Sequence, residues 1–346
     1  MVLDSQASAA ADIANAISKS LERVVQTLET PNGAQSASPV KITLAQTATT
    51  PLTPVSPNIF LNLVIGAVLG IGFGIGGALL RETLNIRIRN ERDVSLITPV
   101  AILGGIAFDE KAVSRPLVVH IDPTSPLAES FRTLRTNLQF LDVGRVDRSF
   151  VITSSNQAEG KSTIAANLAI AMADSGARVL LVDGDLRRSK VAEYMGLEGA
   201  VGLTDVLIGR VALMDAIQLW GRKQLYVLPA GHIPPNPSEL LGSTVMRKLI
   251  SELDSLFDVV LYDAPPLLPV TDAAILSKGV GGVVMVVAAG HTHKNDLRNS
   301  ITALANVGIT ISGIVLTMTP TKGPDAYRYG HHAYGYFPTT AIGNQI

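Results

Sequence analysis

The sequence predicts an α/β domain, a parallel sheet with helices on both faces, preceded by one transmembrane helix and a short extracytoplasmic segment. Two observations support this fold class. From Arg148 onward, short β-branched runs alternate with longer helical stretches. Upstream, one long apolar segment contains no charged residue. Continuous apolar strands that alternate with helices are typical of a parallel sheet buried on both faces.

Composition limits the classes of function. A chain of 346 residues is long enough for one large domain or two smaller ones. The net charge of -1 gives no sign of a nucleic-acid partner, and the absence of cysteine excludes disulfides, iron–sulfur clusters and cysteine-bound zinc. The histidine pairs His291/His293 and His331/His332 are interpreted as solvated loop residues rather than metal ligands.

The N-terminal part, residues 1–58, is predicted to be an extracytoplasmic segment. It contains one amphipathic helix, followed by a Ser/Thr/Ala/Gln-rich stretch over residues 30–50. The apolar face of that helix is formed by Ile13, Ile17, Leu21, Val24 and Leu28. Prolines at every third position, Pro51, Pro54 and Pro57, predict a stiff polyproline II connector that leads to the membrane.

Residues 59–80 are predicted to form the transmembrane helix. About 22 residues at ~1.5 Å each span roughly 33 Å, enough for a hydrocarbon core of about 30 Å. A buried core helix is the alternative, but no charge occurs from Ile42 through Leu80. Three glycines of this segment lie at four-residue spacing: Gly66, Gly70 and Gly74. They either permit close helix packing or reflect the general frequency of glycine in membrane helices.

The charges that flank this helix predict its orientation. Four arginines follow the helix, namely Arg81, Arg87, Arg89 and Arg92. The nearest positive charge before the helix is Lys41. The positive-inside rule therefore predicts a single-pass plasma-membrane protein with residue 81 onward in the cytoplasm.

The cytoplasmic part divides into a juxtamembrane linker over residues 81–115, a domain over residues 116–320 and a flexible tail over residues 321–346. Six strands are expected at Phe150–Thr153, Val179–Val182, Leu225–Leu228, Val259–Leu261, Val283–Val287 and Ile311–Leu316. Helices are expected at Ser162–Ala173, Thr244–Leu256 and Lys294–Asn306. Ligands of such sheets bind at the carboxyl ends of the strands.

A phosphate-binding loop follows the first of these strands and opens a helix. It consists of Ser155, Asn156, Gln157, Ala158, Glu159, Gly160, Lys161, Ser162 and Thr163. Backbone N–H groups at the helix N-terminus and the charge of Lys161 suit the phosphates of ATP, and the Ser162 hydroxyl suits Mg²⁺. The motif predicts a P-loop nucleotide site that binds ATP and Mg²⁺.

Acidic residues end two other predicted strands. Asp183 and Asp185 follow Val179–Val182, and Asp263 follows Val259–Leu261. For either aspartate motif alone, a helix cap or a turn residue is the better explanation. Together with Lys161 they predict a catalytic group in which Ser162, Asp185 and Asp263 hold Mg²⁺. Asp183 is expected to orient or deprotonate an incoming hydroxyl, and the roles of the carboxylates are interchangeable.

Four of the seven tyrosines lie within ten residues of the tail: Tyr327, Tyr329, Tyr334 and Tyr336. They are surrounded by Gly, His and Pro without apolar periodicity, so a packed core is not expected there. Beside a nucleotide site, this cluster is interpreted as a set of phosphate acceptors rather than as a low-complexity tail.

Residues 150–266 resemble the bacterial protein-tyrosine kinases. Their first motif, T-S-x-x-P-G-E-G-K-S, is similar to residues 153–162, their D-x-D-x-R matches Asp183, Asp185 and Arg187, and their D-x-P-P matches Asp263, Pro265 and Pro266. Their E-x-x-R-x-x-R helix, which packs against a neighbouring subunit, matches Glu129, Arg132 and Arg135. The proline-spaced membrane entry resembles the end of polysaccharide chain-length regulators, to which these kinases are often fused.

The resemblance implies several further properties. It implies a homo-oligomer, in ring form, that phosphorylates its tail tyrosines in trans and regulates capsular or exopolysaccharide synthesis and export. The implied partners are the membrane, the polysaccharide machinery and a counteracting tyrosine phosphatase. Two residues depart from the family pattern, because Gln157 and Ala158 replace Pro-Gly.

Two alternatives remain open. The first is a membrane-bound chain-length regulator whose nucleotide site is weak or not catalytic, which the methyl group of Ala158 favours. The second is a switch ATPase of the partition and septum-positioning type. Such ATPases usually carry a second lysine early in the loop, where this chain has Ser155 and Asn156, and they lack a tyrosine tail.

Overall fold

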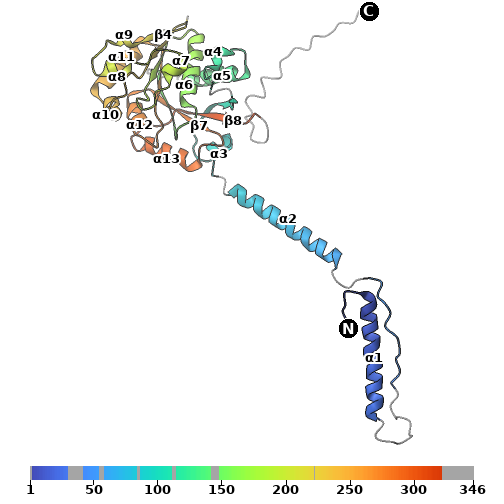
Figure 1. Ribbon diagram of the computed structural model, residues 1–346. Helices are drawn as coiled ribbons and strands as arrows, with labels where there is room; N and C mark the ends of the chain where they lie inside the picture. Colours follow the sequence, from blue (N-terminus) through green and yellow to red (C-terminus); the bar gives the residue numbers. More distant parts are fainter. Residues whose placement is uncertain are drawn as a thin grey trace, which may run out of the picture. The chain divides into compact units, whose positions relative to one another are not determined.

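The computed structural model describes residues 2–29, 42–53, 58–83, 86–110, 114–141, 148–221 and 223–321, in two compact units, Met1–Asn85 and Ile86–Ile346 (Figure 1). The predicted tail with its four tyrosines, the pair His331/His332, and the prolines Pro54 and Pro57 lie outside the described residues.

The first unit contains two helices. The amphipathic helix is present as α1 (Ala7–Glu29), and the side chain of Asn15 makes two hydrogen bonds to the backbone of Ala48, of 2.8 and 3.0 Å. The second helix, α2 (Ile59–Thr83), contains the span Ile59–Leu80, with a mean hydropathy of 2.3 and no buried part. By length and composition it is the one helix among the described residues that could cross a membrane.

The second unit is built on an eight-stranded sheet in the order β1-β8-β7-β2-β6-β3-β5-β4. All neighbouring strands are parallel except β4 and β5, which confirms the predicted fold class. The strands are β1 (Ile102–Ala107), β2 (Ser149–Ser154), β3 (Val179–Asp183), β4 (Gln218–Trp220), β5 (Leu225–Leu228), β6 (Val259–Asp263), β7 (Gly282–Ala288) and β8 (Gly313–Thr319).

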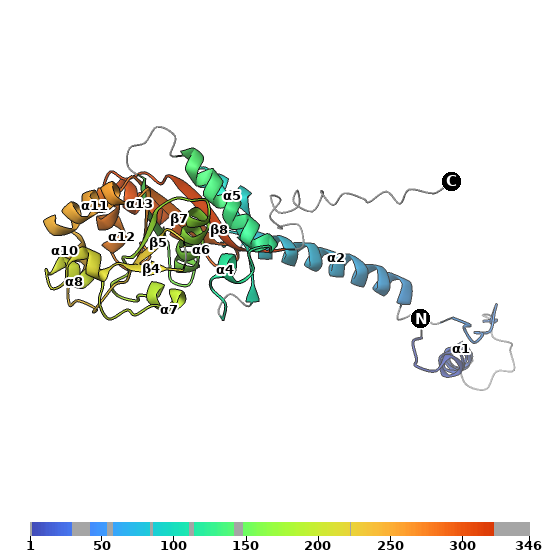
Figure 2. The same cartoon turned by 90° about the horizontal axis from the view of Figure 1, so that it is seen from above.

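Helices cover both faces of this sheet, as Figure 2 shows from above. They are α3 (Glu91–Ser95), α4 (Val118–Ile121), α5 (Pro126–Leu141), α6 (Lys161–Asp174), α7 (Val191–Met195), α8 (Leu203–Leu207), α9 (Leu213–Ala216), α10 (Pro237–Leu241), α11 (Thr244–Leu256), α12 (Asp272–Leu276) and α13 (Lys294–Ala305). Successive strand residues point to opposite faces. Leu180 packs in one core with residues of α11, α12 and α13, and Leu181 packs in the other with residues of α5 and α6.

Two strands, β1 and β4, were not expected from the sequence, and β1 lies within the predicted linker. Where the sequence predicts a linker over residues 81–115, the structure places β1 in the sheet beside β8 and buries Ile88 and Val94 in the core. Two consecutive glycines, Gly104 and Gly105, weaken the strand pattern of β1. The antiparallel strand β4 has three residues, which is too short for a periodic signal.

The order of the central strands brings the acidic motifs together. β6 lies between β2 and β3, and the parallel register places Asp263 beside Ile152 of β2 on one side and Asp183 of β3 on the other. Because parallel strands end at the same edge, these residues and the loop after β2 meet at the carboxyl edge of the sheet.

Candidate active site

Of the nine residues predicted to bind phosphate, residues 155–160 form the phosphate-binding loop between β2 and α6, and Lys161, Ser162 and Thr163 form the first turn of α6. Gly160 precedes this helix with a φ of 92°, in the left-handed region where a side chain would add strain. The helix begins at Lys161, so its free backbone N–H groups face the loop and favour an anion there.

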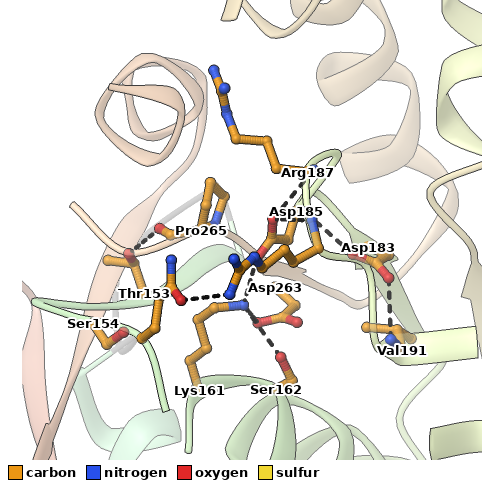
Figure 3. Close-up of polar contacts among 12 residues, drawn as sticks. Thr153, Ser154, Lys161, Ser162, Asp183, Asp185, Arg187, Val191, Asp263 and Pro265 are labelled. Atoms are coloured by element: carbon orange, nitrogen blue, oxygen red, sulfur yellow. Dashed lines mark hydrogen bonds and ion pairs between the residues drawn. The ribbon is translucent and has the colours of Figure 1, made fainter. Parts of the chain in front are cut away.

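Lys161 lies at the centre of the polar contacts at this edge (Figure 3). Its Nζ donates to Asp185 Oδ2 at 2.9 Å, to Asp263 Oδ1 at 3.4 Å and to the hydroxyl of Ser162 at 3.3 Å. The structure therefore brings together Lys161, Ser162, Asp185 and Asp263, which the sequence analysis assigns to one site.

Asp183 has a different environment from its neighbour Asp185. Asp183 Oδ1 accepts the backbone N–H of Asp185 at 3.2 Å, and Oδ2 accepts that of Val191 at 3.1 Å. Asp185 Oδ1 accepts the backbone N–H of Arg187 and Arg188, which leaves Oδ2 directed at Lys161. Both carboxylates thus hold the loop after β3 in shape, and Asp185 is the one that faces the lysine.

Negative charge dominates the site. Three carboxylates, all nearly or fully buried, surround one lysine: Asp183, Asp185 and Asp263. Burial and the neighbouring charge of Asp263 raise the pKa of Asp183 to about 8. Burial also raises the pKa of Asp263, although the charge of Lys161 opposes that shift. Burial lowers the pKa of Lys161, but the charges of Asp263 and Asp185 outweigh this effect and hold its pKa above the ordinary value, so the lysine stays charged.

These residues fit a magnesium ion that is completed by a nucleotide. No group of three or more His, Cys, Asp or Glu side chains in the described part of the chain forms a metal site by itself. Mg²⁺ typically takes one or two carboxylates from the protein, with phosphates and water as the other ligands. Asp263 Oδ2 is buried without a hydrogen-bond partner, next to Asp185 and Ser162, so an acceptor remains available for a cation or its water.

The two residues that depart from the family pattern have distinct conformations. Ala158 has a φ of 61°, a left-handed conformation in which glycine would be unstrained. Gln157 Oε1 accepts a hydrogen bond of 2.6 Å from Arg188, which links the tip of the phosphate-binding loop to the loop after β3. A proline at position 157 would lack this contact.

The phosphate-binding loop is also braced from the C-terminal third of the chain. Asn156 donates to Asp296 at 2.8 Å, and the hydroxyls of Ser155 and Ser300 lie 2.9 Å apart. Glu159 is fully buried, and burial raises its pKa to about 7 despite hydrogen bonds from Thr292 and the backbone, which lower it. The loop is therefore held by α13 and by the turn that precedes this helix.

Arg187 was identified from the sequence, but the residues Ser238, Asp272 and Thr292, which also support the site, were not. Arg187 donates to Asp272 at 2.7 Å, and Ser238 donates to the same carboxylate at 2.5 Å, which fixes the loop after β3 against α10 and α12. Asp272 and Thr292 belong to no short motif. The sequence marks Asp272 only as a polar residue that opens a short apolar helix, and this pattern does not identify it as part of the site.

The residues predicted to mediate oligomerisation lie on α5. Arg132 pairs with Glu129 at 2.6 Å on the exposed side of the helix. Arg135 donates instead to the carbonyl of Ala171 on α6 at 3.2 Å. Glu129 and Arg132 thus present a charged surface, whereas Arg135 joins two helices of the same domain.

Comparison with known proteins finds one matching family model and relatives that are tyrosine-protein kinases. The family model of the AAA domain matches residues 149–301. Tyrosine-protein kinase YwqD of Bacillus subtilis (strain 168) is 40% identical over 66% of this chain and 93% of its own length. Tyrosine-protein kinase etk of Escherichia coli (strain K12) is 29% identical over 82% of this chain. This chain spans 42% of etk, about two fifths of the longer relatives.

Solved structures agree with this assignment. The chimerical protein CapA2B2 is 37% identical, with a TM-score of 0.62 over 67% of this chain and 100% of that chain. The kinase domain of the Escherichia coli tyrosine kinase ETK is 29% identical, with a TM-score of 0.62 over 68% of this chain and 95% of that chain.

The conformation of Ala158 leads to a first prediction. Replacing Ala158 with Gly removes the cost of a left-handed alanine, and we expect the free energy of unfolding to rise by about 0.5–1 kcal/mol. Urea denaturation in detergent, followed by the fluorescence of the single tryptophan Trp220, measures the change. Ala303→Gly within α13 is the matched control and should lower stability by about 1 kcal/mol. A loss of stability in both variants contradicts the strain at Ala158.

The buried carboxyl of Glu159 leads to a second prediction. Its pKa of about 7 lies above the ordinary 4.5, so the folded state binds more protons between these values, and stability falls as the pH rises through this window. Between pH 5 and pH 8 we expect the wild type to lose roughly 2 kcal/mol more than Glu159→Gln, which does not titrate. The other carboxyls titrate in both proteins and cancel in the difference. If the free energy of unfolding, plotted against pH, runs parallel for the wild type and Glu159→Gln, the pKa of Glu159 is not raised.

Proposed function

Since the chain belongs to the bacterial tyrosine-protein kinase family, we propose that it is an autokinase that transfers the γ-phosphoryl group of ATP to tyrosines of its own C-terminal tail. The observation that carries this proposal is the meeting of Lys161, Asp185 and Asp263 beneath a phosphate-binding loop. The 40% identity to YwqD over 93% of that kinase supports tyrosine as the acceptor.

The residues of the site suit each part of the transfer. The bond between the γ-phosphorus and the bridging oxygen breaks and leaves ADP, while a new bond forms from the tyrosine oxygen to phosphorus. Lys161 and the N–H groups of the loop stabilise charge on the phosphate oxygens. Mg²⁺, held through Ser162, Asp185 and Asp263, would neutralise phosphate charge when bound.

Asp183 is our proposed acceptor of the proton that leaves the tyrosine hydroxyl. A base whose pKa is raised toward the working pH is suited to this step, and burial together with the charge of Asp263 raises the pKa of Asp183 above its ordinary value. Its side chain is fully buried in this state, so the hydroxyl reaches it only after the loop after β3 moves. Asp185 is the alternative base if that loop stays closed.

The proposed acceptors are Tyr327, Tyr329, Tyr334 and Tyr336, which the C-terminal tail would present to a neighbouring subunit. Transfer in trans within a homo-oligomer suits this arrangement. Of the residues predicted to mediate oligomerisation, the exposed Glu129 and Arg132 are the proposed contact residues, and Arg135 would support them by joining α5 to α6. Each phosphate adds about -1.5 to -2 charges, so several on one tail would repel adjacent subunits. Phosphorylation would then loosen the oligomer.

The cellular setting is part of the same proposal. The apolar helix Ile59–Leu80 would anchor the kinase to the plasma membrane, with the arginines after it in the cytoplasm. The proposed role is regulation of capsular or exopolysaccharide synthesis and export, with a tyrosine phosphatase that reverses the modification.

A second candidate function is a membrane-bound chain-length regulator whose nucleotide site is weak. The left-handed Ala158 favours it, because this conformation costs about 1 kcal/mol and places a methyl group where the backbone approaches phosphate.

Mixing two complementary variants of the chain tests the proposal. One chain carries Lys161→Met with its tail intact, and the other has its four tail tyrosines changed to Phe with an intact site. After incubation with labelled ATP and Mg²⁺, the Lys161→Met chain alone should contain at least about 100-fold less phosphotyrosine than the wild type. In the mixture, label should return on the Lys161→Met chain and identify transfer in trans.

Phosphoamino-acid analysis and peptide mapping provide the readout. No phosphotyrosine in the wild type would favour the chain-length regulator. Label that remains on the Phe variant alone would refute the assignment of the tail as acceptor.

A further inference from the structure

An acidic side chain lies buried inside the loop that is expected to bind phosphate. Glu159 is fully buried, directly before Gly160 and Lys161. A negative charge close to phosphates is electrostatically unfavourable, and burial adds a cost of its own. Glu159 therefore needs compensating contacts, and the structure provides two of them.

The carboxylate of Glu159 joins the start of the loop to a distant segment. Oε2 accepts the backbone N–H of Ser155 at 2.9 Å, which closes the loop from its first residue to its fifth. Oε1 accepts the hydroxyl of Thr292 at 2.7 Å, from the turn between β7 and α13. The backbone carbonyl of Glu159 also accepts the hydroxyl of Thr317 on β8 at 2.7 Å.

Thr292 is oriented for this contact. It is 1% exposed, and its hydroxyl oxygen accepts the backbone N–H of Ala288 at 2.9 Å. Since that N–H donates to the oxygen, the hydroxyl proton of Thr292 is free to point at Glu159. The carbonyl of Thr292 accepts the N–H of Ile88 at 2.9 Å, so its backbone is fixed as well.

We propose that Glu159 and Thr292 are positioning residues that shape the phosphate-binding loop before the nucleotide arrives. The bond to Ser155 holds the loop curved, and the bond to Thr292 holds the carboxylate in place. The strained Ala158 lies within this closed loop, and a strained residue persists when the surrounding contacts fix it.

The test measures nucleotide binding, because the inference rests on the proposed function only in taking residues 155–160 as a phosphate site. Full-length protein in detergent is titrated with a fluorescent ADP analogue and Mg²⁺. Thr292→Val keeps the shape of the side chain but removes the hydroxyl, and it should weaken binding about tenfold. Thr292→Ser keeps the hydroxyl and should stay within about twofold of the wild type.

A double variant separates positioning from general destabilisation. If Thr292 acts on the nucleotide through Glu159, then Glu159→Ala should weaken binding at least as much as Thr292→Val, and the pair together should be no weaker than Glu159→Ala alone. This comparison stands even if one variant lowers the melting temperature, which is measured in parallel.

Three results would overturn the inference: wild-type ADP binding by Thr292→Val, equal weakening by Thr292→Ser, or additive losses in the double variant. A failure of the proposed function looks different. In that case the wild type binds ADP, and the variants behave as expected, but no phosphotyrosine forms.

Discussion

The ion pairs of Lys161 with Asp185 and Asp263 connect the three elements of the site. The lysine opens α6, Asp185 follows β3 and Asp263 ends β6, so these contacts form only when the three elements meet at one edge of the sheet. The parallel register, with Asp183 beside Asp263, produces that meeting. Removing one partner of a buried pair leaves an uncompensated charge, which costs about 3–5 kcal/mol. The site and the fold are therefore coupled.

The same charges define what the site can accept. In the structure Lys161 is bound to carboxylates, whereas in the proposed reaction it contacts phosphate. The exchange brings further negative charge toward Asp183, Asp185 and Asp263, which is tolerable only with a divalent cation beside them. The unpartnered Oδ2 of Asp263 and the hydroxyl of Ser162 lie where such a cation would bind. The negative cluster thus explains why nucleotide and Mg²⁺ are expected to bind together.

The sequence predicted those parts of the site that follow from local pattern. Asp183, Asp185 and Asp263 were identifiable because each follows an apolar strand, and parallel strands share a carboxyl edge. Lys161 was identifiable from the loop that precedes its helix. Thr292 was not, because it lies 133 residues from Glu159 and only the folded β7–α13 turn brings them together. The glycines of β1 concealed an edge strand, so a linker was expected there. The left-handed φ of Ala158 is likewise a property of the folded loop that the residue type does not reveal.

The buried carboxylates and the nucleotide are expected to share a magnesium ion. The most direct test is the affinity of ADP for the full-length protein with Mg²⁺ and with EDTA, measured by calorimetry for the wild type and Asp185→Asn. We predict that Mg²⁺ strengthens ADP binding by at least about tenfold in the wild type, or ~1.4 kcal/mol, and that this gain is lost in Asp185→Asn. An equal gain in both proteins, or none in the wild type, would show that Asp185 and the nucleotide do not share a magnesium ion.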